Sequence, residues 1–377
     1  MVGKADYSNQ LNDEWKIETG IKGAFSNFEN DVLIENFDGQ EFVEDPSLTN
    51  FSNLDERILA AYASADYKLN DKTSLKLGLR YEHINSQLDT DTQGKVVDRQ
   101  SGNLFPSAFI SHKVNDTLSF NLSYSKRITR PTFNDIAPFL IFFDPTTFFA
   151  GNPAIQSSIS NSIKFDVNYR SLILSAQYSI EDESISRFQP QFDEENDRLI
   201  YKSANIDKTK VFAITLGVPV TITNWWKLQN NLIFLNTKVE DNIDGLPLNF
   251  KQNSFNFNNS QSFNLAENLT AELDFYYSGP RLSGSTRRDG IYGMNIGVQK
   301  KFSDKWGRLL FSVRNIWDSL DFKSNTNIPE QNLNARRIID FQNRTFSLTY
   351  SRNFGNRDLK SQRDRETGAE EERRRVN

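Results

Sequence analysis

The sequence has no cysteine and only two histidines, His83 and His112, among its 377 residues. The lack of cysteine excludes a disulfide framework, a zinc site built on thiolates, an iron–sulfur cluster and a cysteine nucleophile. The two histidines fall on different expected strands and in no nucleophile motif, so neither imidazole catalysis nor a shared metal site is expected. The glycines at 293 and 297 lie in an expected strand with no helix after it, unlike those of a phosphate-binding loop. We therefore expect a protein that is not an enzyme and that binds no cofactor and no metal.

Long apolar runs and an excess of positive charge are missing as well. No segment approaches the roughly 20 uninterrupted apolar residues of a transmembrane helix, and the mean hydropathy is −0.59. The net charge of −5 argues against a nucleic-acid partner, because nucleic-acid-binding surfaces are usually strongly basic. The N-terminus shows no basic segment followed by an apolar core, so no signal peptide is visible. This favours either a cytoplasmic protein or a chain that begins partway through a longer one.

The feature that dominates the sequence is strict alternation of apolar and polar residues. In segment 118–125, Leu, Phe, Leu and Tyr alternate with Ser, Asn, Ser and Ser. The same alternation occurs at 75–81, 163–169, 172–178, 212–220, 269–277 and 346–350. A period of two places apolar side chains on one face of a strand and polar side chains on the other. About fifteen strands of this kind are expected between Val2 and Phe354.

The connections between these strands alternate in length. Short turns rich in Asn, Asp and Ser are expected at 70–72, 115–117, 170–171, 223–224, 266–268 and 303–305. Longer polar connections are expected between them, for example at 27–54, 85–101, 130–156 and 181–207. A series of hairpins with short turns at one end and long loops at the other is typical of an outer-membrane barrel.

The apolar face could pack inside a soluble β-sandwich or could face lipid around a polar lumen. Expected strands of about 10–16 residues are long for a sandwich, and the polar face is rich in Asn, Ser, Lys, Arg and Asp, as in a hydrated lumen. Aromatic residues near the strand ends fit the interfacial girdles of a barrel: Tyr67, Tyr81, Tyr124, Tyr169, Tyr178, Tyr277, Trp225, Trp226, Trp306 and Tyr350. We predict an all-β fold, a transmembrane antiparallel up-and-down β-barrel, over residues 1–355. A charged, disordered periplasmic tail is expected over residues 356–377.

Four segments resemble TonB-dependent outer-membrane receptors. Residues 78–82, Gly-Leu-Arg-Tyr-Glu, look like a strand end of these receptors, and residues 122–131 are similar to their Tyr-Ser-x-x-hydrophobic-x-Arg-Pro strand. Residues 151–155, Gly-Asn-Pro-Ala-Ile, resemble their Gly-Asn-Pro-x-Leu segment, and residues 313–318 resemble a late Val-x-Asn-hydrophobic-x-Asp strand. The aromatic loop and the charged tail are similar to those of the outer-membrane β-barrel branch found in Bacteroidetes-type bacteria. The resemblance covers most of the chain, from Tyr62 to Phe354.

This resemblance implies a location in the bacterial outer membrane and a barrel of 22 strands, of which the chain would supply strands eight to twenty-two. It implies contact with membrane lipid and lipopolysaccharide, and with a plug domain and the TonB protein in the full-length protein. The signal peptide, plug and TonB-contacting segment of the family are not seen in this sequence. The implied function is TonB-dependent uptake of a scarce or bulky ligand such as a siderophore, a glycan or a peptide. A passive channel or a structural barrel is the alternative, and a barrel hydrolase is disfavoured by the scarcity of histidine.

Two groups of residues are candidates for ligand contact. The first is the loop 133–151, stiffened by prolines, whose candidate residues are Phe139, Phe142, Phe143, Phe148 and Phe149. Exposed loops seldom carry so many Phe side chains, so these either bind a ligand or pack into the barrel mouth. The second is the basic group at 126–130, in which Arg127 and Arg130 could attract an anionic ligand or a lipopolysaccharide phosphate, or could form a charged rim. The acidic segments 181–183 and 193–197 lack the spacing of a calcium loop and are expected to be solvated turns.

Overall fold

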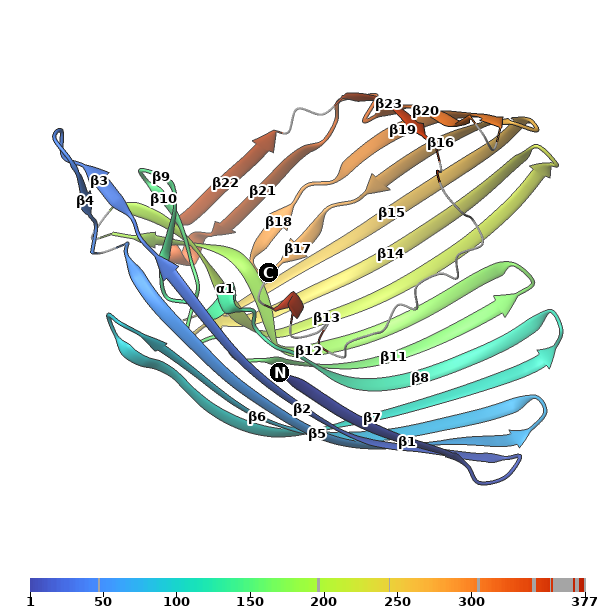
Figure 1. Ribbon diagram of the computed structural model, residues 1–377, viewed down its shortest axis with the longest axis horizontal. Helices are drawn as coiled ribbons and strands as arrows, with labels where there is room; N and C mark the ends of the chain where they lie inside the picture. Colours follow the sequence, from blue (N-terminus) through green and yellow to red (C-terminus); the bar gives the residue numbers. More distant parts are fainter. Residues whose placement is uncertain are drawn as a thin grey trace.

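The computed structural model describes residues 1–46, 48–194, 197–243, 245–303, 306–340, 344–352, 354, 369 and 373–375. Fifteen strands form one antiparallel wall that curves around an open interior (Figure 1). In chain order these are β1 (Val2–Gln10), β2 (Trp15–Val32), β5 (Asn50–Asn70), β6 (Thr73–Thr90), β7 (Gly94–Asn115), β8 (Leu118–Thr129), β11 (Ser158–Tyr169), β12 (Leu172–Asp193), β13 (Arg198–Thr223), β14 (Trp226–Ile243), β15 (Leu246–Ala266), β16 (Leu269–Ser278), β19 (Ile291–Ser303), β20 (Gly307–Arg314) and β23 (Thr345–Ser351). Each strand pairs with the next one in this order, so the predicted antiparallel up-and-down arrangement of about fifteen strands is confirmed.

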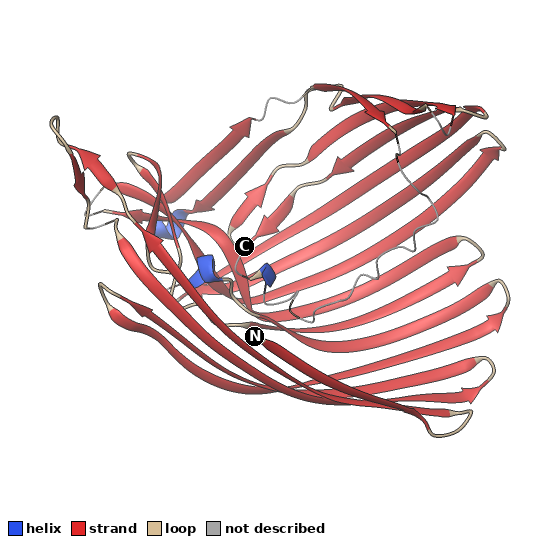
Figure 2. Ribbon diagram, in the orientation of Figure 1, coloured by secondary structure: helices blue, strands red, loops and turns tan. Residues whose placement is uncertain are grey.

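The remaining elements lie in the long connections. They are the hairpin β3 (Glu35–Phe37) and β4 (Phe42–Glu44), the short helix α1 (Phe133–Ile136), the hairpin β9 (Leu140–Asp144) and β10 (Thr147–Ala150), and a second sheet of β17 (Arg281–Ser283), β18 (Thr286–Arg288), β21 (Asp321–Ile328) and β22 (Leu333–Asp340), with a 3-10 turn at Pro329–Gln331. Figure 2 shows how little of the described chain is helical. No helix in the described part of the chain is long and apolar enough to cross a membrane.

The short turns form as the sequence predicts, because asparagine side chains satisfy the turn backbone. The Asn115 side-chain oxygen accepts hydrogen bonds from the backbone N–H groups of Thr117 and Leu118 at 2.9 and 3.0 Å. Two of the expected long connections are instead continued strands: β6 and β7 pair up to a turn at 91–93, and β12 and β13 pair beyond residue 190. Polar side chains on both faces of these extensions hide the alternation, while backbone hydrogen bonds still pair the strands.

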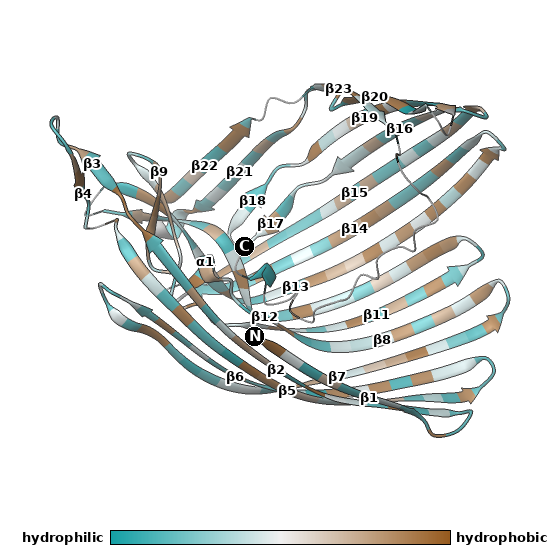
Figure 3. Cartoon of the chain, viewed as in Figure 1, coloured by the Kyte–Doolittle hydropathy of each residue, from teal (hydrophilic) through white to brown (hydrophobic). Residues whose placement is uncertain are grey.

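The strand register places the apolar residues of neighbouring strands on one continuous outer face. Ala61 of β5 lies opposite Tyr81 of β6, which lies opposite Leu104 of β7. Large apolar side chains on this face are open to the surroundings, for example Leu79 at 51% and Leu122 at 44% exposure. Figure 3 shows the resulting alternation of hydrophobic and hydrophilic residues along the strands. Such a broad exposed apolar band is what a lipid-facing barrel wall presents.

The opposite face of the wall is polar and lines the concave side. On β6 it carries Lys76, Arg80 and Glu82, which form ion pairs with other side chains of the same face. At the short-turn end of the outer face, Trp15 stacks on Tyr67 with ring centroids 4.4 Å apart, as in an interfacial girdle. The structure therefore has the expected arrangement, with apolar side chains outward and polar side chains around the interior.

The wall has two edges within the described residues. There, β1 pairs with β2 alone and β23 pairs with β20 alone. An edge strand leaves backbone N–H and C=O groups unpaired, and unpaired backbone groups are costly in lipid. Of the expected tail over 356–377, only Ala369 and Arg373–Arg375 belong to the described residues, so its disorder stays a prediction.

Candidate functional site

The connection between β8 and β11 folds back into the mouth of the curved wall (Figure 1). Its buried side chains share one apolar cluster with three wall strands: Phe133, Ile136, Ala137, Phe139 and Ile155 from the connection, and Leu54, Leu88 and Val97 from β5, β6 and β7. The ring of Phe133 also meets the edge of Phe28 on β2, with centroids 4.4 Å apart. Burying a side chain of this size contributes about 1.5–3 kcal/mol, so the cluster holds the connection against the wall.

The five Phe residues predicted to contact ligand differ in how far their side chains are buried. Phe139 and Phe148 are buried, and Phe149 is half-buried. Phe142 and Phe143 are 53% and 66% exposed, on the β9 strand of the loop hairpin. Phe139 packs in the apolar cluster at the mouth, whereas Phe148 is buried in the loop hairpin, where it meets the edge of Phe142 and lies under the Arg198 guanidinium. Ligand contact by these five residues stays a prediction.

Asp135 fixes the position of this connection. Its carboxylate is buried, and it accepts hydrogen bonds from the Arg187 guanidinium at 2.7 and 2.6 Å, from Ser203 Oγ at 2.9 Å, and from both the backbone N–H and the hydroxyl of Thr132 at 2.8 Å. Burial alone would raise the pKa of Asp135, but the hydrogen bonds from Arg187 and Thr132 outweigh burial and lower it. One carboxylate thus joins the start of α1 to β12 and β13.

The predicted basic group at the end of β8 is split by the structure. Arg130 is buried and pairs with Glu82 on the inner face, and Arg80 pairs with the same carboxylate. Arg127 is exposed on β8. Arg130 therefore belongs to a charged network of the wall, whereas ligand contact at Arg127 stays a prediction.

The second sheet carries five arginines that sequence reasoning did not single out, of which Arg281 lies on β17 and the other four on β18 and β22. Arg287 and Arg336 lie on either side of Asn325 in the register of β18, β21 and β22, and Arg288 and Arg337 lie on either side of Ser324. One face of this small sheet therefore carries Arg287 and Arg336, and the other carries Arg288 and Arg337 together with Arg281, which lies opposite Arg288. We call Arg287, Arg288, Arg336 and Arg337 the arginine sheet. No ion pair joins any of them to a carboxylate within the described residues.

One face of the arginine sheet lines a cavity of about 490 Å³, whose polar lining includes Lys251, Arg287, Lys323, Asn325 and Arg336. Asp289 contributes the carboxylate of the lining. The charge of Lys323 is paired with Asp321 at 3.1 Å. Positive charge therefore prevails in this cavity. Such a cavity favours an anionic ligand, because a guanidinium binds carboxylate, phosphate or phenolate oxygens through charge-assisted hydrogen bonds.

The other face of the arginine sheet meets aromatic side chains from three elements. The Arg337 guanidinium lies over the rings of Tyr201 and Phe188, 5.0 and 5.7 Å from their centroids. Phe149 stacks on Tyr201 and meets the edge of Phe188, each at 5.6 Å. Burial lowers the pKa of Arg288, and the positive charges of Arg281 and Arg337 lower it further. The predicted residue Phe149 therefore adjoins a group of cations that repel one another.

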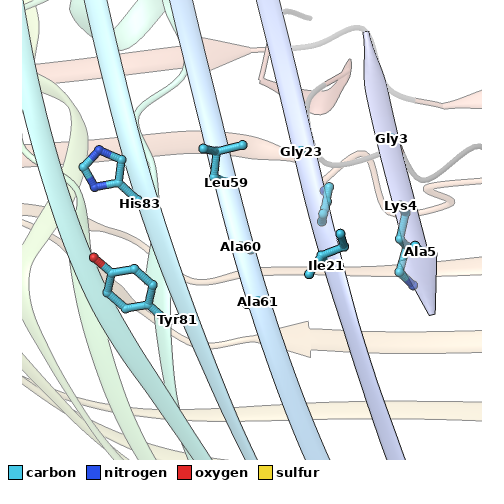
Figure 4. Close-up of a pocket in the computed structure, with 11 residues that line it drawn as sticks. Gly3, Lys4, Ala5, Ile21, Gly23, Leu59, Ala60, Ala61, Tyr81 and His83 are labelled. Carbon is cyan, nitrogen blue, oxygen red and sulfur yellow. The ribbon is translucent and has the colours of Figure 1, made fainter. Parts of the chain in front are cut away.

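A largely apolar hollow lies on the outer face (Figure 4). It has a volume of about 720 Å³ and is lined by Ile21, Gly23, Leu59, Ala61, Tyr81 and His83 among others. These residues belong to the lipid-facing set defined by the strand register. The hollow therefore faces hydrocarbon and is not a place for a water-borne ligand.

The histidines do not come together. His83 borders the outer hollow, whereas His112 places its Nδ1 atom 2.9 Å from the Thr73 hydroxyl. Within the described ranges, no three His, Asp or Glu side chains are grouped so as to hold a metal ion. In the acidic segment 193–197, Glu195 and Asn196 lie outside the described residues.

A comparison with protein families matches residues 1–350 to the outer membrane protein beta-barrel family. A comparison with curated proteins gave no match. Among solved structures, the chain is similar to the copper transporter OprC (12% identity, TM-score 0.65), the ferric yersiniabactin uptake receptor FyuA from Yersinia pestis (11%, 0.63) and the ferric-catecholate import receptor Fiu from K12 E. coli (12%, 0.62). Each match covers 92% of this chain and 55%, 52% and 53% of the respective structure. The chain thus spans about half the length of these proteins, and at such low identity the likeness concerns the fold.

Proposed function

Because the chain belongs to the outer membrane protein beta-barrel family, we propose that it forms the membrane wall and ligand-capturing mouth of a TonB-dependent receptor for an anionic ligand. The chain lies in the outer membrane, and its wall resembles the barrels of TonB-dependent receptors. Dependence on TonB, a plug domain inside the polar interior, and contact with lipopolysaccharide are parts of the proposal. The two edge strands support a larger barrel, because further strands would pair their backbone groups in lipid.

The observation that carries the proposal is the arginine sheet. Its four guanidinium groups stand at the mouth, two on one face of a small sheet and two beside Arg281 on the other, with no carboxylate paired to these four within the described chain. Uncompensated guanidinium groups repel each other, so an anion that bridges them binds favourably. The rings of Phe149, Phe188 and Tyr201 beside Arg337 add a surface on which a flat ring can stack. A ferric siderophore with catecholate groups combines negative charge with flat rings and is the ligand class that we favour over a neutral glycan or a cationic peptide.

Binding of a ferric tris-catechol complex to the detergent-solubilised chain tests the proposal. Tryptophan quenching should give a dissociation constant that rises at least about tenfold in an Arg336→Ala, Arg337→Ala double variant, because charge-assisted hydrogen bonds are lost. The control is Arg170→Ala, which removes an arginine at the short-turn end of the wall. Equal affinity in the double variant and the control would contradict capture of the anion by the arginine sheet.

Uptake tests the energy source separately. The full-length protein should accumulate the ferric complex in cells with TonB and not in cells without it. Accumulation that does not depend on TonB would instead support the passive channel, and a stable large conductance in planar bilayers would support it further.

A further inference from the structure

Arg375, two residues before the end of the sequence, lies inside the curved wall, at the end opposite to the one where the last wall strand finishes. β23 ends at Ser351 on the short-turn side. Arg375 contacts Glu56 on the inner face of β5 and Pro131, which follows β8 at the long-connection end.

Three groups of the wall and mouth hold Arg375. The Glu56 carboxylate accepts hydrogen bonds from both terminal guanidinium nitrogens, one of them at 2.9 Å. The Pro131 carbonyl oxygen accepts from Nε at 3.1 Å and from a terminal nitrogen at 2.9 Å. The backbone N–H of Phe133 donates to the Arg375 carbonyl oxygen at 3.1 Å. These three groups thus bind both the guanidinium group and the main-chain carbonyl of the same arginine.

This contact differs from an ion pair on an open surface. The side chains of Glu56 and Arg375 are 7% and 14% exposed, and Glu56 forms no other ion pair within the described residues. A paired carboxylate at this depth is stable, while removal of its partner leaves a buried charge without compensation. The planar fork of arginine satisfies two oxygens of Glu56 and a carbonyl at the same time, which a lysine ammonium does not.

We propose that the interior contains an arginine-binding site, formed by the Glu56 carboxylate, the Pro131 carbonyl and the Phe133 amide, and that the C-terminal segment of this chain occupies it through Arg375. The site recognises one arginine within a peptide, because it binds the side chain and the main chain of the same residue. A cavity of about 640 Å³, lined by Arg99, Asn103 and Gln156 among others, adjoins the bound arginine and leaves room for the residues beside it. Any other peptide that enters this end of the interior must displace Arg375 or find Glu56 already neutralised. The proposal does not depend on which ligand the arginine sheet captures.

The chain has no cysteine, so two introduced cysteines can be spin-labelled without a background. We choose Arg374→Cys beside the bound arginine and Asp116→Cys in an exposed turn at the opposite end. Pulsed electron resonance on the full chain should give one narrow distance distribution. The distribution should broaden in the Arg375→Ala and Glu56→Gln variants, and should stay narrow in the matched controls Arg373→Ala and Asp55→Asn. Asp55 is the exposed neighbour of Glu56 on the other face of β5.

A broad distribution in the parent chain, or a narrow one that persists in Arg375→Ala, would overturn the proposal. If Glu56→Gln fails to fold, Arg375→Ala decides, because that change lies outside the wall strands. A second measurement uses a fluorescent peptide of residues 369–377 added to the Arg375→Ala chain. Its affinity should be at least about tenfold higher than that of the same peptide with Ala in place of Arg375. Equal affinities would show that no arginine is recognised.

Discussion

Replacing Asp135 by alanine should release the connection that closes over the mouth of the wall. The change removes the acceptor of five hydrogen bonds from Arg187, Ser203 and Thr132. Hydrogen bonds to a buried charged group contribute about 1.5–3 kcal/mol each. The Arg187 side chain is 45% exposed and regains water when its partner is lost, so its share is discounted. Alanine also avoids the desolvation cost of the buried carboxylate, which offsets most of the contribution of the other bonds. We expect the free energy of local opening to fall by about 2–3 kcal/mol, which raises the open population roughly 30- to 150-fold.

Hydrogen exchange measures this opening at two amides. The Ala137 N–H donates to the Phe133 carbonyl at 2.9 Å, and the Gly151 N–H donates to the Ala137 carbonyl at 3.1 Å. Both should exchange faster in Asp135→Ala by the factor given above. The control is Asn134→Ala, an exposed position in the same turn of helix, for which we expect a change below about twofold. Exchange in Asp135→Ala within about threefold of that control would refute the role of the carboxylate.

The same carboxylate predicts how the connection responds to acid. Burial raises the pKa of Asp135, and the hydrogen bonds from Arg187 and Thr132 lower it by more, so the folded pKa lies below the ordinary value. The stabilisation is therefore present above the ordinary aspartate pKa of about 3.9 and is lost as the pH falls through the lower folded value. In the parent chain, protection of Ala137 corrected for intrinsic exchange should fall in this acid range. In Asp135→Ala that fall should be absent.

Three further predictions concern the wall and the loop. Leu79→Lys, on the lipid-facing side, should destabilise the membrane-inserted chain by about 2–4 kcal/mol. Its control, Asn121→Lys on the inner face, should be tolerated. Equal urea midpoints of unfolding for the two variants in lipid vesicles would contradict this assignment of the faces. Gly151→Ala should accelerate the same amide exchange as Asp135→Ala, because its new Cβ would lie 2.6 Å from the Ala137 backbone nitrogen; unchanged exchange would mean that the backbone relaxes freely. Phe143→Ala should leave thermal unfolding unchanged, because the ring is largely exposed, and a large drop in the unfolding temperature would show that it packs.

Much of the fold follows from local sequence patterns. Alternation in segments such as 118–125 determines which residues share a face, because successive side chains of a strand point to opposite sides. Asparagine turns such as the one at Asn115 determine where hairpins reverse, because the side chain satisfies the turn backbone. The motif at 151–155 also has a local explanation in part: the Asn152 side-chain oxygen accepts from the Ala154 N–H at 2.9 Å. In each case the interacting residues lie within a few positions of each other in the sequence, so the interaction can be predicted from the sequence.

The candidate sites show where that reasoning stops. The phenylalanines of the loop look alike in sequence, yet Phe139 is buried against β5–β7 and Phe143 is exposed. The difference arises because the loop folds back onto strands that lie far away in the chain. The arginine doublets at 287–288 and 336–337 are visible in the sequence. Only the pairing of β18 and β22 with β21 places Arg287 and Arg336 on one face of the sheet, and Arg288 and Arg337 on the other.

By itself, the sequence determined the all-β class, the two-faced strands, the alternation of short turns and long connections, and the assignment of the apolar face to lipid. Each of these depends on the period of the side chains along one strand and on the composition of the two faces. Only the tertiary structure decided that Asp135 joins the loop to β12 and β13, that the arginine sheet forms at the mouth, and that Arg375 reaches Glu56, 319 residues away in sequence. Charges and hydrogen bonds depend on distance in space, and the sequence does not show which residues so far apart the folded chain brings together.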